Sequence, residues 1–516
     1  MPETVQRSWG SLSGRQTAAI LAAICAGGMM FRIHQMDPGV PLIWDAILYF
    51  WYATDAMILG ALPPGYDFAN NGWPLFLAGV FALIDSNHYM DYMAAQRITG
   101  AALSVLAAIP IYYICRRFLP AIPALAGPAI LVFDPRIAEN SLRGYTEPLF
   151  VLLASLVLAC FLARDRRIVW AAFPIISLAA MVRGEATVLI VPYLILYIAR
   201  FRGRRAVLEA ALLALVFLLV LAPMLSYRID ATGTDGIFMR ITATGTNIAS
   251  GEISRPPGAT PEGITTILVR NLPLMAVAVP PGAYLLARRH GRDALPVLVI
   301  LGASAAVSAV ALSAYFVPRY MFIMLPMWSL LAALAVSWIA GITPRRRTAL
   351  VLVTGMIIAV SVAAGEYKRS SIDLSAEADG RHIAAAIWAA AGTDPVMAIE
   401  ASRMPSLPLW GLDEFPVLRD DAPLPGRSIS HCADPPCADP GGGPEALAAY
   451  LLGEGSDITH LVADGPGYNA GGVLLHMFEN AADYPYLEEI YDSRDAGFAY
   501  HVKAFAVDRG ALERHP

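Results

Sequence analysis

The stretch AVLEAALLALVFLLVLAPMLS, residues 206–226, decides the class of fold. Glu209 is its one ionisable residue. A helix needs roughly 20 apolar residues to cross the hydrocarbon of a bilayer, so this stretch predicts a membrane span. Ten further runs bring the prediction to eleven spans, with 168–182 and 186–199 also fitting a re-entrant pair. The predicted spans are residues 17–33, 97–115, 121–138, 146–163, 168–182, 186–199, 206–226, 265–287, 294–316, 320–341 and 348–364.

The composition of the 516 residues agrees with a polytopic membrane protein. Charged residues make up 15% of the chain and hydrophobic residues 57%, and the mean hydropathy is +0.54. Soluble domains carry about a quarter charged residues, so an ordinary soluble enzyme is excluded. The net charge of −5 offers no basic excess for nucleic acid. The high apolar content also excludes disorder over most of the chain.

A change in composition divides the chain into two domains. Residues 1–365 hold nearly all the long apolar runs, whereas 366–516 are mixed and rich in Asp, Pro and Gly. The second part has a normal single-domain length. Its segment RHIAAAIWAAAG predicts a helix, and DPVMAIEA, ITHLVAD and FAYHVKAFAVD predict strands. We therefore expect a transmembrane domain followed by a soluble α/β domain, in which no residues form a catalytic constellation.

The distribution of arginine predicts the orientation of the spans. Basic residues cluster in every second loop, and cytoplasmic loops carry such an excess. This places the N-terminus in the cytoplasm, and it places residues 34–96, 139–145, 227–264 and the C-terminal domain outside. The clusters are Arg116 and Arg117; Arg164, Arg166 and Arg167; Arg200, Arg202, Arg204 and Arg205; Arg288, Arg289 and Arg292; and Arg345 to Arg347.

The first outer loop, residues 34–96, is too long for a simple connection and too apolar for a solvated one. Its runs IWDAILYFWYATDAMI and GWPLFLAGVFALI predict two juxtamembrane helices. Asp45 lies at the start of the first run. The residues alone favour a helix N-cap for its carboxylate. The alternative is a general base, because partial desolvation raises the proton affinity of a carboxylate. Asp37 and Asp55 are its competitors.

Further ionisable groups gather at the predicted outer ends of the spans, where charges are usually paired or functional. One interpretation is mutual pairing, of Arg143 with Glu147 or of Arg183 with Glu185. The other is a shared polar cavity, which explains why the charges collect at one face. No compact carboxylate and histidine cluster demands a metal ion. The residues concerned are Glu139, Arg143, Glu147, Arg183, Glu185, Arg319 and Tyr320.

The five cysteines fall into two groups. Three lie in or beside predicted spans, where a thiol behaves as a small apolar group. Cys432 and Cys437, in the string CADPPC, lie in the predicted exported domain. We expect them to form a disulfide because that side of the membrane is oxidising. The alternative is a metal site formed by these two thiols and His431, but such a site lacks a fourth ligand nearby.

The order of these features resembles the GT-C superfamily of polyprenyl-phosphate-sugar-dependent glycosyltransferases. The closest likeness is to the protein O-mannosyltransferase and lipid A aminoarabinose transferase group, and it covers residues 17–341 in order. The strings that carry it are WDAILYF, NNGWPLFLAGVFALI, QRITGAALSVLAAIPIYYICRRF, RGYTEPLFVLL, MVRGEATVLIVPYL and FVPRYMFIMLP.

The resemblance implies an inverting transfer from a lipid-phosphate-linked sugar to an acceptor on the extracytoplasmic side. Asp45 would remove the acceptor proton, and Arg319, Arg183 and Arg143 would hold the lipid phosphate. Glu147, Glu185 and Tyr320 complete the predicted substrate-binding set. The C-terminal domain would cap the cavity or help to recognise the acceptor.

The chain also departs from the family pattern. Ala46 follows Asp45 where many relatives have a second acidic residue, and Gly72-Trp73-Pro74 replaces a paired-proline string. The double-tryptophan motif of oligosaccharyltransferases is absent, which argues against transfer of whole glycans to asparagine. Two other functions stay open: a transporter or lipid flippase, and a non-catalytic envelope assembly factor in which Asp45 only caps a helix.

Overall fold

The structure is a computed structural model, in which the chain forms two compact units. The first comprises Met1–Met36, Leu62–Leu77 and Arg97–Arg369, and the second comprises Asp37–Ala61, Ala78–Gln96 and Ser370–Pro516. Within them the structure describes residues 9, 12–42, 45–62, 71–86, 89–232, 235–236, 266, 273–315, 317–371, 375–392, 397–400, 426–427, 443–453, 455–466 and 473–514.

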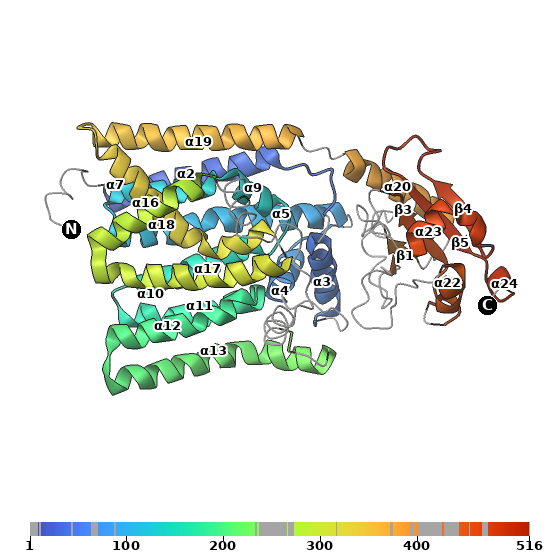
Figure 1. Cartoon of the computed structure of the whole chain (residues 1–516), viewed down its shortest axis with the longest axis horizontal. Coiled ribbons are helices and arrows are strands. Elements are labelled where there is room, and N and C mark those ends of the chain that lie inside the picture. The colour runs from blue at the N-terminus through green and yellow to red at the C-terminus, as the bar shows by residue number, and fades with distance from the viewer. Residues whose placement is uncertain are drawn as a thin grey trace. The chain divides into compact units, whose positions relative to one another are not determined.

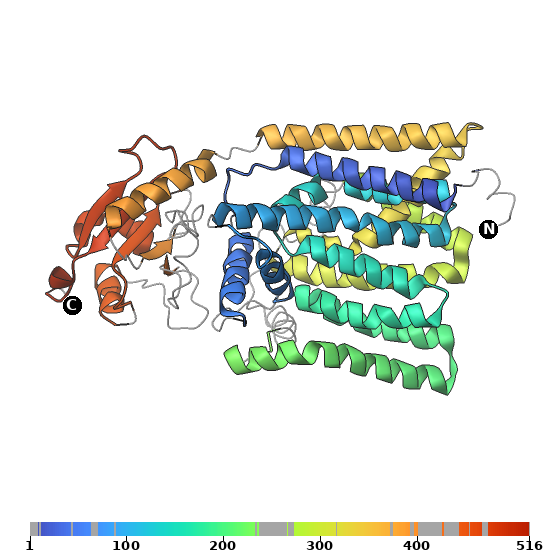
Figure 2. The same cartoon turned by 180° about the vertical axis from the view of Figure 1, so that it is seen from behind.

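The first unit is a bundle of apolar helices (Figures 1 and 2). Each of the eleven predicted spans overlaps one or more helices of this bundle. Helices α10 to α13 lie side by side in chain order. The bundle contains α2 (Gly14–Gln35), α5 (Tyr89–Leu106), α6 (Ala108–Phe118), α7 (Ala121–Ala124), α8 (Ala126–Val132), α9 (Pro135–Leu142), α10 (Glu147–Leu162), α11 (Arg166–Val182), α12 (Glu185–Phe201), α13 (Gly203–Thr232), α16 (Pro273–His290), α17 (Leu295–Tyr315), α18 (Leu325–Ala340) and α19 (Arg346–Ser371).

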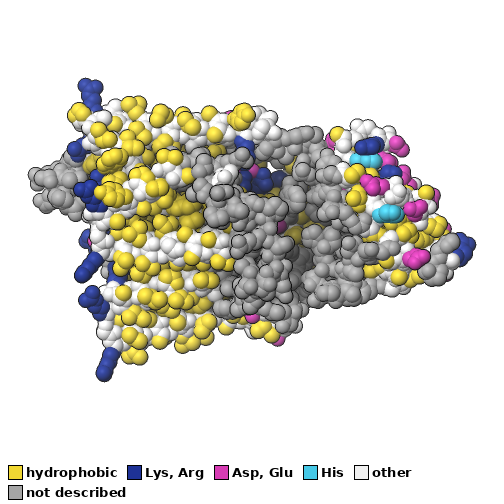
Figure 3. Space-filling model, viewed as in Figure 1, with side chains coloured by type: hydrophobic (Ala, Val, Ile, Leu, Met, Phe, Trp, Pro, Cys, Tyr) yellow, Lys and Arg dark blue, Asp and Glu magenta, His cyan; other side chains and the backbone are white. Residues whose placement is uncertain are grey.

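The apolar helices confirm the predicted polytopic class. Among the described residues, six helices are long and apolar enough to cross a membrane, and a bent helix pair would make a seventh. Helix α18 forms the centre of the bundle, because Leu330 to Leu334 are almost fully buried. Helix α19 instead exposes Val351, Leu352 and Met356. Figure 3 shows apolar side chains along the helices and basic ones over one end of the bundle. The total of eleven spans remains a prediction.

The predicted span 121–138 is broken rather than continuous. Its two parts, Ala121–Val132 and Pro135–Leu142, meet at 51°. Asp134 caps the second part by accepting the backbone N–H groups of Arg136 and Ile137. The buried guanidinium of Arg32 donates to the carbonyl oxygen of Val132 over 2.8 Å, at the end of the first part. A cap and an arginine thus satisfy the backbone groups that the break leaves free.

The long first loop contains the two expected helices, α3 (Asp45–Leu59) and α4 (Gly72–Phe81). Within the second unit, contacts between aromatic rings hold α3, the end of α4 and the start of α5 together. Phe81 lies 5.7 Å from Phe50 and 5.5 Å from Tyr92, between ring centroids. Gln96 donates to the carbonyl oxygen of Ala46 over 3.0 Å. The position of both helices at a membrane surface stays a prediction.

The C-terminal part of the second unit is the expected small α/β domain. Its sheet has the order β2-β1-β3-β5-β4, with β1 parallel to β2 and β3 and the other pairs antiparallel. The sequence did not predict β4. The domain contains α20 (Ser375–Ala391), β1 (Met397–Glu400), β2 (Gly426–Arg427), α22 (Pro444–Leu452), β3 (His460–Asp464), α23 (Val473–Glu479), β4 (Leu487–Asp492), β5 (Val502–Val507) and α24 (Arg509–Leu512).

Apolar side chains from the sheet and its helices form the core of this domain. Leu461, Phe505 and Met477 are fully or almost fully buried there, together with Leu447 and Leu451. Cys432, Cys437 and His431 lie outside the described residues, so the disulfide stays a prediction.

Candidate functional site

A network of ion pairs surrounds the carboxylate of Glu147, the first residue of α10. Only 1% of the Glu147 side chain is exposed. Its Oε1 forms an ion pair with Arg183 and lies 3.6 Å from Nε of Arg319. Arg183 also binds Glu185, with 2.6 Å between Nη2 and Oε1. The structure therefore brings together four of the residues that the sequence indicated.

Aromatic rings cover both arginines of this network. The guanidinium carbon of Arg183 lies 5.1 Å from the ring centre of Tyr320. That of Arg319 lies 4.9 Å from the ring centre of Tyr145. Such cation–π contacts favour the charged form where water is scarce. Burial lowers the pKa of Arg183, but the charges of Glu185 and Glu147 outweigh burial and hold that pKa above its ordinary value.

Local backbone features position the network. Gly144 has a φ of +79°, which glycine adopts readily, and it separates α9 from α10. The buried indole of Trp73 donates its N–H to the carbonyl oxygen of Gly144 over 3.1 Å. A Cβ atom on Gly72 would lie 2.8 Å from the carbonyl carbon of Met181, so glycine allows α4 to approach the end of α11. The start of α4 therefore braces the turn before Glu147.

Arg143 belongs to a second network. Its Nη2 lies 2.5 Å from Oε1 of Glu139, which Arg136 and Lys368 also bind. The suggested pairing of Arg143 with Glu147 is therefore wrong, whereas that of Arg183 with Glu185 is confirmed. Arg143 keeps a side-chain hydrogen bond with Tyr145, whose ring Arg319 covers.

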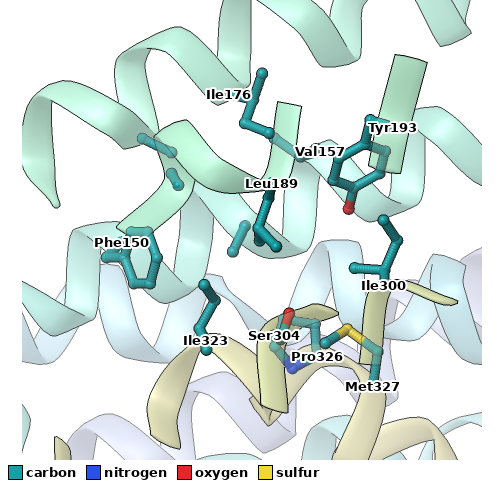
Figure 4. Close-up of a pocket in the computed structure, with 13 residues that line it drawn as sticks. Phe150, Val157, Ile176, Leu189, Tyr193, Ile300, Ser304, Ile323, Pro326 and Met327 are labelled. Carbon is teal, nitrogen blue, oxygen red and sulfur yellow. The ribbon is translucent and has the colours of Figure 1, made fainter. Parts of the chain in front are cut away.

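An apolar pocket lies beside the Glu147 network (Figure 4). Phe150 lines it, and the ring centre of Phe150 lies 5.8 Å from the guanidinium carbon of Arg183. Ile323, from the same 3₁₀ helix as Arg319, η2 (Pro318–Met324), lines it too. Tyr193 and Ser304 bring the only hydroxyl groups among its lining residues. Arg183 thus lies one aromatic ring away from a small apolar cavity of about 20 Å³.

Asp45 belongs to the second unit, whereas the residues of both networks belong to the first. It is the first residue of α3 and is partly buried. Sequence reasoning missed Tyr145 and Lys368. Tyr145 stands between Arg143 and Glu147 in the string RGYTE, so its position in the same turn was a usable signal. Lys368, far along the chain, gave none.

Among the residues that the structure describes, no three His, Cys, Asp or Glu side chains are grouped so that they could hold a metal ion.

Comparison with known proteins defines the class by its fold. No protein-family model matches the chain, and no curated protein matches its sequence. Solved structures of an oligosaccharyltransferase and of ArnT, which have the GT-C fold, do match, and the chain shares that fold. This confirms the resemblance at the level of the fold. Together with the apolar helices, it describes an integral membrane protein.

Three solved structures illustrate the likeness. ArnT from Cupriavidus metallidurans bound to undecaprenyl phosphate has a TM-score of 0.60 at 14% identity, covering 96% of this chain and 99% of that one. The oligosaccharyltransferase AglB from Archaeoglobus fulgidus, with an inhibitory peptide and a dolichol-phosphate, has a TM-score of 0.56 at 11% identity, covering 86% and 69%. The Archaeoglobus fulgidus oligosaccharyltransferase with zinc and sulfate has a TM-score of 0.54 at 12% identity, covering 86% and 68%.

Proposed function

We propose that the chain is an inverting membrane glycosyltransferase, which moves a sugar from a polyprenyl-phosphate-linked donor to an acceptor on the extracytoplasmic side. The observation that carries the proposal is that Arg183 and Arg319 both face the buried carboxylate of Glu147. A donor of this class has an anionic phosphate joined to an apolar chain. Similar folds hold undecaprenyl phosphate and a dolichol-phosphate.

The two arginines differ in exposure. Arg183 is 7% exposed and binds two carboxylates. Arg319 is 21% exposed, and its Nε lies 3.6 Å from Oε1 of Glu147. Arg319 is therefore our candidate for holding the departing phosphate, since a guanidinium can bind two phosphate oxygens at once. Arg183 would keep Glu147 and Tyr320 in position.

Asp45 is the proposed general base. The acceptor hydroxyl oxygen forms a bond to the anomeric carbon as the bond from that carbon to the phosphate oxygen breaks. The acceptor proton passes to the Asp45 carboxylate, and the negative charge that develops on the lipid phosphate is stabilised by Arg319. Attack from the face opposite the phosphate inverts the anomeric centre.

The side of the membrane is inferred from charge. Basic side chains gather over one end of the bundle (Figure 3), and cytoplasmic loops carry such an excess. Glu147 and Arg183 lie at the other ends of α10 and α11 from Arg164 and Arg167. This supports an extracytoplasmic reaction.

The proposal is tested by replacing Asp45 with asparagine in full-length protein in proteoliposomes. Sugar transfer from a radiolabelled polyprenyl-phosphate sugar to membrane extracts should fall by at least about a thousandfold, within the range that a general base supplies. Donor binding should be retained. The control is Asp37→Asn, an exposed competitor that should keep turnover. Full turnover in the Asp45 variant would refute the assigned base, and lipid movement without sugar transfer by the wild type would favour a flippase.

A further inference from the structure

Three basic side chains converge on the single carboxylate of Glu139. Arg136 Nη1 lies 2.8 Å from Oε2, and Arg143 Nη2 lies 2.5 Å from Oε1. Lys368 Nζ contacts the same Oε2. The three come from separate places: α9, the turn after it, and the end of α19. This group, Arg136, Glu139, Arg143 and Lys368, is called here the Glu139 cluster.

The basic side chains of the Glu139 cluster are more exposed than its carboxylate. The side chain of Glu139 is 14% exposed, against 44% for Arg143, 43% for Lys368 and 22% for Arg136. Arg136 and Arg143 alone exceed the one negative charge of Glu139. An arginine has five N–H donors, and one carboxylate cannot use those of two arginines. The cluster therefore offers positive charge and hydrogen-bond donors to its surroundings.

Two other carboxylates lie nearby. Asp134 is buried, accepts the backbone N–H groups of Arg136 and Ile137, and interacts with the charges of Arg32 and Arg136. Glu366 lies 3.2 Å from Nε2 of His34. Glu139 is the carboxylate that all three basic side chains contact.

The cluster lies at the end of a helix suited to face lipid. Only 11% of the apolar 18-residue stretch of α19 is buried. Met356 and Val360 are exposed along it, and Tyr367 is 77% exposed directly before Lys368. Tyrosine is enriched where hydrocarbon meets headgroups, and lysine extends its amine toward that boundary. The Glu139 cluster is therefore expected at the level of lipid phosphates.

We propose that Arg136, Arg143 and Lys368 form a binding site for a phosphate oxyanion, separate from the Glu147 network. The phosphodiester of an anionic phospholipid is one source of that oxyanion, and free phosphate is the other. Two guanidinium groups and an ammonium suit the several oxygens of a phosphate. Arg143 contacts Tyr145, whose ring Arg319 covers. The test is nevertheless independent of the proposed function, because it substitutes only Arg136 and Lys368.

The experiment uses the full-length protein in nanodiscs made of phosphatidylcholine, with or without phosphatidylglycerol. Native mass spectrometry counts the phosphatidylglycerol molecules that remain bound. The double substitution Arg136→Gln with Lys368→Gln should weaken their retention by about tenfold, which is ~1.4 kcal/mol. Arg347→Gln, at the opposite end of α19, is the matched control and should retain them. Lys368→Arg should also retain them, which separates a lost site from a damaged fold.

A second arm distinguishes the two sources. In phosphatidylcholine nanodiscs, inorganic phosphate should raise the unfolding temperature of the wild type and not of the double variant if the site takes free phosphate. Retention of phosphatidylglycerol without that rise identifies a lipid site. If neither ligand distinguishes wild type from the double variant, the proposal is overturned. Sugar transfer is not measured, so failure here leaves the test of Asp45 unaffected.

Discussion

Arg319 and Glu147 lie 3.6 Å apart, between Nε and Oε1, although they come from distant parts of the chain. The start of η2 and the start of α10 thus meet at one carboxylate. Glu147 also binds Arg183, so one buried carboxylate serves two arginines. Arg183 also binds Glu185 and is 7% exposed, against 21% for Arg319. The more exposed arginine is the one that we propose holds a ligand.

The first prediction compares these arginines. Arg319→Gln should weaken binding of a polyprenyl-phosphate donor by about tenfold or more, because a charge-assisted contact to phosphate is lost. The unfolding temperature should change little. Arg183→Gln should instead lower the unfolding temperature, since it leaves the buried Glu147 without its closest cation. Donor titration and thermal unfolding of both purified variants check this. Equal effects of the two substitutions on donor binding would contradict the division of roles.

The second prediction concerns Glu147. Replacing it with glutamine keeps its volume but removes the charge that Arg183 and Arg319 share. The first unit should lose about 2 kcal/mol of stability, the range for a hydrogen bond to a charged group. Thermal unfolding in detergent measures the loss, with the exposed Glu513→Gln as the control. Identical unfolding of both variants would show that the Glu147 network does not stabilise the fold.

Sequence alone predicted the helices well because bilayer thickness sets the length of a span. It missed the break near Asp134, although Asp134-Pro135 is a visible helix start. It also predicted which charges gather at span ends. It could not predict the partner of Arg143, because pairing at a four-residue spacing needs a continuous helix. Gly144, at a φ of +79°, interrupts the helix between Arg143 and Glu147, so Arg143 pairs backward with Glu139.

Other contacts of the site depend on parts of the chain that sequence proximity cannot relate. Lys368 reaches Glu139 across 229 positions of sequence. Trp73 reaches Gly144 across 71. Such contacts follow from how helices rotate and pack, and apolar runs carry little information on rotation because lipid-facing and buried positions are equally apolar.

The third prediction concerns pH and the β4–β5 pair. Burial raises the pKa of Asp492. The backbone N–H of Arg494 and the side chains of His501 and Lys503 outweigh burial and hold this pKa below its ordinary value of 3.8. A carboxylate with a lowered pKa stabilises the fold above its unfolded value, and this contribution is lost as the pH falls through its folded value. In the wild type, the protection of β4 and β5 from hydrogen exchange should therefore decrease when the pH is lowered below about 4.

Two substitutions test that acid response in the full-length chain. Asp492→Asn should reduce the protection of β4 and β5 at neutral pH and should make its further loss in acid shallower. Asp495→Asn, exposed in the turn that follows β4, should behave as the wild type. An equally steep acid loss in the Asp492 variant would assign the response to another group.

The fourth prediction concerns the cysteines. Cys25, Cys115 and Cys160 are free thiols, whereas Cys432 and Cys437 are expected to form a disulfide on the oxidising side of the membrane. Denatured protein from membranes prepared with an alkylating agent should carry three alkyl groups, and five after reduction. Intact mass spectrometry measures both numbers. Because a disulfide in the C-terminal domain requires export of that domain, five alkyl groups without reduction would count against the predicted orientation as well as against the disulfide.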